Sequence, residues 1–184
     1  VDGTIEQLDG PRSFDVQPLR SGALPGANPA EVAEFWREYE SAVRTHSAMV
    51  IALAKMLTKI ERIQQVIAHS TADIGDMDDR VVTLRTALLD IDQQLNGNRS
   101  KQEPGEKFRP IINDRLFSVS RGVDRSTYGP TTTHRRMLEI ANEQIKDIHG
   151  KLVLAEVNLT ALVKDLVAKG APWMEGEPLS TIGK

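Results

Sequence analysis

Three stretches of this chain repeat their apolar residues mostly in steps of three and four positions, which is the spacing of one face of an α-helix. In the first stretch no Gly or Pro interrupts the chain between Pro29 and Gly75. It predicts about 40 helical residues, on the order of 60 Å in length, and so long a helix needs partners to cover its apolar face. We expect its buried seam to consist of Val32, Phe35, Tyr39, Val43, His46, Val50, Leu53, Leu57, Ile60 and Ile67.

The second and third stretches keep the same rhythm, and a shorter series lies between them. The second stretch contains Met77, Val81, Leu84, Leu88, Ile91 and Leu95. The third contains Leu138, Ala141, Ile145, Ile148, Leu152, Ala155, Leu159, Leu162 and Leu166. The shorter series is Ile112, Leu116, Val119 and Val123. Repeats of this length indicate knobs-into-holes packing between neighbouring helices.

These patterns predict a mainly α protein, an elongated three-helix antiparallel bundle with an extra short helix and a short N-terminal β segment. We expect helices near 29–70, 77–96 and 132–169, with the short helix near 110–122. The second long helix is about half as long as the others, so it fills the return leg together with the short helix. The residues expected to be buried together include Leu53, Leu57, Leu88, Ile145, Leu152 and Leu159.

The predicted helix ends carry the usual signals. Asn28 is a preferred N-cap, Pro29 suits the first helical position, and Glu31 completes a pattern resembling a capping box. Gly97 and Gly170 follow the second and third long stretches, where a left-handed backbone ends a helix at low steric cost.

Residues 1–20 differ from the rest of the chain. The segment "GPRSFDVQPL" places Phe14, Val16 and Leu19 loosely between polar residues, which indicates a strand, and "TIEQL" is a second, poorer one. Two short strands do not form an independent sheet. Either they pack on the helices, or they are the last strands of a preceding β-domain, which is the interpretation we favour. We therefore divide the chain into terminal strands (1–20), linker (21–28), helical bundle (29–175) and tail (176–184), and we expect it to come from a longer precursor.

Composition excludes several classes of function. The 184 residues carry a formal net charge of −3, with Lys and Arg interleaved with Asp and Glu, so we expect no nucleic-acid partner. The absence of cysteine removes disulfides, thiol nucleophiles and thiolate metal sites. No apolar run approaches the roughly 18 residues that span a bilayer. Protein partners remain, and an oligomer is one of the possibilities.

Catalytic and metal-ligating patterns are weak. His46 lies on the apolar seam, where a satisfied core histidine is favoured over a ligand, and His69, His134 and His149 show no metal-ligand spacing. The acidic turn "DIGDMDD" is explained by helix capping and the helix dipole. We therefore expect no enzyme activity from this chain alone, no cofactor and no specifically bound metal.

Three residues are candidates for packing or interaction: Trp36, Pro172 and Trp173. Pro172 and Trp173 follow the Gly that ends the last helix. Trp173 could seal the end of the bundle, anchor another domain or belong to a loose tail. We favour the seal, with Trp173 covering apolar residues near the turn between the first two helices, such as Ile67 or Met77, or Ile74 within that turn.

Several local segments resemble one protein family. They are "GPRSFDVQPL" with its Pro-rich linker, "NGNRSKQEPGEKFRPIINDRL", "STYGPTTTHRRMLEIANEQIKDI" and the ending "GAPWMEGEPL". Together they look like the C-terminal region of bacterial sortilin-like BNR/Asp-box repeat proteins, often labelled glycosyl hydrolases. In that family a helical tail follows a β-propeller and a β-sandwich. Thr131, Thr133 and Arg136 match its helix-start pattern, whereas no Asp-box occurs in this chain.

The resemblance implies a non-catalytic accessory or interaction domain at the C-terminus of an exported β-propeller protein, in the periplasm or outside the cell. Any glycosidase chemistry of the family would then reside in the propeller. The alternative is a self-standing coiled-coil adaptor or oligomerisation module.

Overall fold

The computed structural model describes residues 10–15, 17, 25–70, 75–97, 109–124, 126 and 128–171. In these residues the elements are α1 (Pro29–His69), α2 (Met77–Asn96), α4 (Ile112–Val123) and α5 (Thr132–Ala168). Each agrees with a predicted helix to within two residues at either end. The prediction of a mainly helical chain is confirmed.

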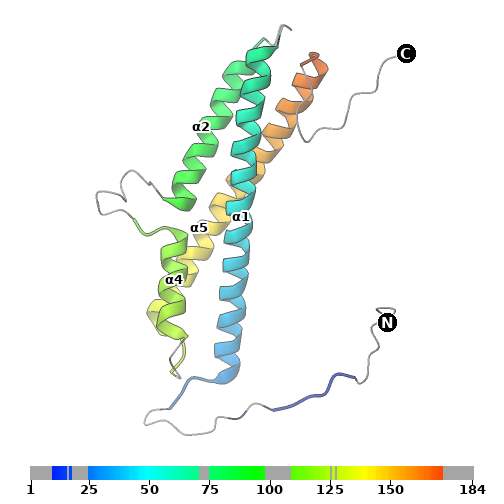
Figure 1. Cartoon of the computed structure of the whole chain (residues 1–184). Helices are drawn as coiled ribbons and strands as arrows, with labels where there is room; N and C mark the ends of the chain where they lie inside the picture. Colours follow the sequence, from blue (N-terminus) through cyan, green and yellow to red (C-terminus); the bar gives the residue numbers. More distant parts are fainter. Residues whose placement is uncertain are drawn as a thin grey trace.

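The helices lie side by side along one long axis (Figure 1). α1 and α5 run in the same direction, while α2 and then α4 return in the opposite direction, one beyond the other. α5 packs against each of the other three helices. The division of the return leg into α2 and α4 follows from the glycine after Asn96, because Gly97 has a φ of +82° and ends α2.

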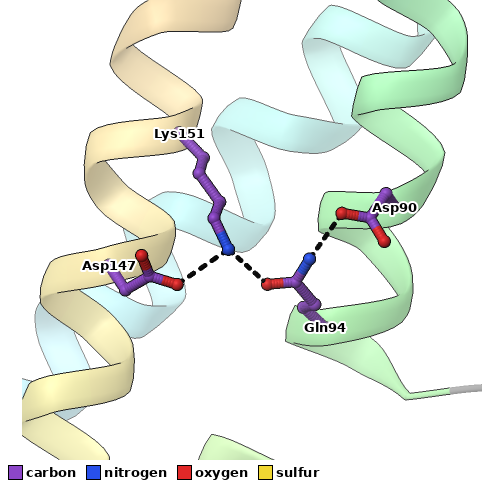
Figure 2. A network of polar contacts seen from close by, with 4 residues as sticks. All are labelled: Asp90, Gln94, Asp147 and Lys151. Carbon is purple, nitrogen blue, oxygen red and sulfur yellow. Dashed lines mark hydrogen bonds and ion pairs between the residues drawn. The ribbon is translucent and has the colours of Figure 1, made fainter.

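A polar network fixes α2 against α5 (Figure 2). The Nζ of Lys151 donates to the Oε1 of Gln94 at 2.8 Å and pairs with Asp147 at 2.7 Å. Gln94 in turn donates to Asp90 within α2. The end of α2 therefore lies level with residues 147–151 of α5.

Two further hydrogen bonds show the register of α1 and of α4 against α5. The Nδ2 of Asn142 on α5 donates to the Oε1 of Glu38 on α1 at 2.8 Å. The Nε of Arg115 on α4 donates to the Oε1 of Gln144 on α5 at 3.2 Å. Because Gln144 lies two turns before Lys151, the junction between α2 and α4 faces the middle of α5.

The helix starts follow the sequence signals. The Oδ1 of Asn28 accepts a hydrogen bond from the backbone N of Ala30 at 2.9 Å, and Glu31 lies in the first turn, near the positive end of the helix dipole. At α5, Thr131 caps the N–H of His134 at 3.4 Å, and the His134 ring accepts from the Thr131 N–H at 3.2 Å. These bonds satisfy backbone donors that have no partner inside the helix.

The core is formed by one face of each helix. All the residues predicted for the second and third long stretches and for the short helix are buried. For α1 the predicted seam is partly wrong. The buried residues of α1 are Phe35, Ala42, Met49, Leu53, Met56, Ile60, Ile63 and Ile67. The predicted seam residues Val32, Tyr39, Val43, His46, Val50 and Leu57 are only partly buried.

The error in α1 has a geometrical cause. Ala42, Met49 and Met56 belong to the buried row, and Val43, Val50 and Leu57 form an adjacent row one position later. Both rows are apolar and both keep a period of seven, so the spacing alone does not separate them.

The predicted N-terminal strand is not found where the structure describes it. Residues 10–15 and Gln17 are exposed and have no regular structure, and the side chain of Phe14 is 84% exposed. A strand needs a neighbour for its backbone hydrogen bonds, and the described part of the chain contains no second strand to supply one. Val16, Leu19 and the segment "TIEQL" lie outside the described residues.

Candidate functional site

An open groove runs along the surface between α1 and α5. Two adjoining hollows share Ala48, Ala52 and Met56 from α1 and Glu156 from α5, so they form one continuous depression. The two alanines lie one helical turn apart, and their short side chains leave space where larger residues would fill the surface. We call this depression the α1–α5 groove.

The walls of the α1–α5 groove are apolar. Ile51 from α1 and Val153 from α5 line it, and they are 57% and 46% exposed. Its rim is charged, with Lys55 on the α1 side and Glu156 on the α5 side. An open apolar floor with charges at its edges is suited to holding apolar side chains of another protein segment.

His46 occupies a seam position in α1, but it is not the satisfied core histidine expected from the sequence. Its Nε2 is buried and has no hydrogen-bond partner among the described residues. Burial lowers the pKa of His46, because the charged imidazolium is less well solvated inside the bundle than in water. Within α1 itself, the buried residues nearest to His46 are Ala42 and Met49, and their side chains carry no strong hydrogen-bonding group.

The other histidines have separate, local environments. The Nδ1 of His69 lies 2.7 Å from the carbonyl oxygen of Gln65, one turn earlier in α1. His134 takes part in the cap of α5. His149 is exposed and lines the α1–α5 groove.

Trp36 is placed in an aromatic cluster near the start of α1. Its ring centroid lies 6.2 Å from that of Phe35 and 5.2 Å from that of Tyr39, both edge-to-face. The Arg135 guanidinium lies 5.6 Å from the centroid of the Phe35 ring and connects this cluster to α5. Trp36 is therefore a packing residue that joins α1 to the core.

Pro172 and Trp173 lie outside the described residues, so the choice among their three interpretations stays open. Ala171, immediately before them, packs against the core. Near that end of the bundle, Arg80 of α2 pairs with Asp165 of α5 at 2.9 Å. The ends of α1 and α5 and the start of α2 therefore meet at one end of the molecule, as the proposed seal by Trp173 requires (Figure 1).

Two serine hydroxyls of α4 are used in local hydrogen bonds. Ser118 donates to the carbonyl oxygen of Asp114 at 2.8 Å, and Ser120 donates to that of Phe117 at 3.0 Å. Within the described ranges, no three His, Asp or Glu side chains come close enough to hold a metal ion. In the same residues, none of the helices combines the length and apolarity needed to cross a membrane.

The chain matches no protein-family model, no curated protein and no solved structure. The resemblance to the sortilin-like family therefore remains a prediction from the short segments that carry it.

The α1–α5 groove was not predicted from the sequence. Two sequence features point to it in retrospect: Ala48 and Ala52 lie one turn apart beside the seam, and Val153 falls outside the heptad of α5. These residues become a site only when the register of α1 against α5 brings them together.

Proposed function

We propose that this chain is a non-catalytic helical interaction domain, whose role is to pack against another protein domain. Its first partner in this proposal is the rest of its own gene product, an exported sortilin-like protein in the periplasm or outside the cell. The chain would form the C-terminal region of that protein, and any hydrolase activity would belong to the propeller. The family part of the proposal rests on the resemblance of the sequence segments alone.

The observation that supports an interaction role is the α1–α5 groove. Apolar side chains scattered singly over a surface are ordinary, whereas a contiguous apolar depression rimmed by charge is typical of a protein contact. Ile51 and Val153 are both about half exposed and both line this depression. Covering them would remove apolar area from water, which is the main driving force of protein association.

The architecture of the proposed domain is an elongated three-helix antiparallel bundle, with α2 and α4 sharing the return leg. A short β segment before the bundle would complete the sheet of the preceding β-domain. That assignment would explain a strand-like pattern in residues 11–19 without a second strand in the described part of the chain.

A single-cysteine probe tests the proposal, because the chain has no cysteine of its own. Ala48→Cys places a thiol in the α1–α5 groove, and Ser47→Cys places one on a neighbouring exposed position outside it. We expect the Ala48→Cys thiol to react more slowly with a maleimide in the complete gene product than in the 184-residue chain. Ser47→Cys should react at the same rate in both. Equal rates at Ala48→Cys would refute a contact at the groove.

The alternative, a self-standing coiled-coil adaptor or oligomerisation module, is favoured by Leu154 and Val157, two large apolar side chains exposed on the outer face of α5. The sequence immediately upstream of Val1 separates the two: propeller repeats there support the accessory domain, and a start codon there supports the self-standing module.

A further inference from the structure

The face of α5 that points away from the core carries a second regular repeat. Its members are Asp147, Gly150, Leu154, Val157, Ala161 and Lys164, in steps of three, four, three, four and three. Each lies two positions after a buried residue of α5, so the row is turned by about 200° from the core face. We call this row the outer stripe. All its members are exposed, and Leu154 and Val157 are 62% and 60% exposed.

Gly150 has no packing role within the described structure. A Cβ built at this position would meet no atom within 4 Å, so alanine would fit without a clash. Glycine inside a helix is destabilising relative to alanine, because it has more backbone freedom to lose on folding. The missing side chain leaves the backbone of α5 open to close approach from outside.

The outer stripe is complementary to itself when two copies run in opposite directions. A two-fold axis between Leu154 and Val157 places Leu154 against Val157 of the second copy and Gly150 against its Ala161. The same axis places Asp147 against Lys164 at both ends of the contact. A parallel arrangement would instead place Asp147 against Asp147 and Lys164 against Lys164, which like-charge repulsion disfavours.

We propose that the outer stripe is a homodimer contact, in which α5 packs antiparallel against α5 of a second copy of this chain. The two small residues allow the helices to approach, the two large ones fill the centre, and the terminal charges select the orientation. Asp147 already pairs with Lys151, but its side chain is 63% exposed and a carboxylate accepts several hydrogen bonds. It can therefore hold a second cation.

The expected strength of the dimer follows from its size. The stripe extends over about 26 Å of a single helix. A contact of that length between two helices buries a small area compared with the interfaces of most permanent dimers. We therefore expect a reversible, concentration-dependent dimer. This inference rests on the proposed interaction role, and it assigns that role a partner at a surface separate from the α1–α5 groove.

The first test measures the mass of the 184-residue chain by sedimentation and light scattering from micromolar to near-millimolar concentration. We expect monomer and dimer in exchange, and we expect Leu154→Glu to abolish the dimer while the helical circular dichroism is retained. Val82→Glu is the matched control, because Val82 is also 58% exposed but lies on α2. A chain that stays monomeric throughout would overturn the proposal, as would a dimer unaffected by Leu154→Glu.

The second test uses charge reversal to determine the orientation. Lys164→Glu and Asp147→Lys should each dimerise roughly tenfold more weakly than the parent chain, because each places like charges together. An equal mixture of the two variants should recover a heterodimer, in which every charge again meets its opposite. Absence of that recovery in the mixture would contradict the antiparallel contact.

The outcomes separate this inference from the proposed function. A monomeric chain whose Ala48→Cys probe is protected in the complete gene product would refute the dimer and support the interaction domain. A dimer through the outer stripe with an unprotected Ala48→Cys probe would support the inference and remove the groove contact.

Discussion

Replacing His46 with leucine should stabilise the protein, because His46 places a polar atom in the seam without a partner. A buried donor or acceptor left unpaired costs about 1–3 kcal/mol. The Nε2 of His46 is buried and has no hydrogen-bond partner among the described residues. Leucine is of similar size to histidine and carries no polar group. We therefore expect His46→Leu to raise the free energy of unfolding by about 1–3 kcal/mol at neutral pH.

The pH dependence gives a second, independent signature of the same residue. Burial lowers the pKa of His46 in the folded state, so the unfolded chain binds a proton more readily. Both states are neutral at this residue well above its unfolded pKa of about 6.5, and there it adds no pH dependence. As the pH falls from about 6.5 towards the lower folded pKa, His46 should reduce stability progressively. His46→Leu should remove that loss.

The assay is thermal and urea unfolding followed by circular dichroism at a series of pH values. For a chain of this length, 1 kcal/mol corresponds to a shift in Tm of about 2–4 °C. His149→Leu is the matched control, because it makes the same substitution at an exposed position and should leave stability nearly unchanged. A destabilised His46→Leu variant, or one with the pH dependence of the parent, would refute this reasoning.

The remaining predictions concern the core, a helix cap, the tail and metal. Leu88→Ala and Leu152→Ala should each lower the free energy of unfolding by about 2–5 kcal/mol, because both side chains are buried. Leu154→Ala on the outer face should change the free energy of unfolding little. Urea unfolding of the three variants compares these effects. Thr131→Ala should lower the free energy of unfolding by about 1 kcal/mol through loss of the α5 cap, and an unchanged melt would show that this cap is dispensable. Trp173→Ala should cost about 3–5 kcal/mol if Trp173 seals the bundle, and a fully solvated Trp173 fluorescence spectrum in a Trp36→Phe background would instead favour an anchor for another domain. A chelator should leave Tm unchanged, and a fall would reveal a bound metal.

The sequence was sufficient for α2, α4 and α5, in which every residue of the predicted row is buried. In α2 the buried row is apolar throughout from Met77 to Leu95, whereas the row one position later, with Val82 and Leu89, is interrupted by the charged residues Arg85 and Asp92. α1 was harder, because Met49 and Val50 are both apolar and both recur with a period of seven. Which row is buried depends on the position of α5, and that information is not local to α1.

The α1–α5 groove and the unpaired Nε2 of His46 could not be predicted from the sequence, for a related reason. Whether a depression forms beside Ala48 depends on which α5 residues lie opposite, and a shift by one turn would place a different set there. Whether a histidine in a seam finds a partner depends equally on the facing helices. The heptad predicts that His46 faces inward, and the three-dimensional register decides what it meets.

The register also suggests why a polar residue is tolerated at position 46. The bond from Asn142 to Glu38 aligns α5 with α1, and counting on from it places His46 near residue 150 of α5. The bond from Lys151 to Gln94 places the end of α2 at nearly the same level. His46 therefore lies where the return leg passes from α2 to α4, as the middle of α1 does in Figure 1. His46 is only partly buried there, whereas Ala42 and Met49 on either side are buried, so the histidine ring is not fully withdrawn from water. The seam thus places its one histidine at a position that is only partly buried, and it keeps apolar residues at the buried positions on either side.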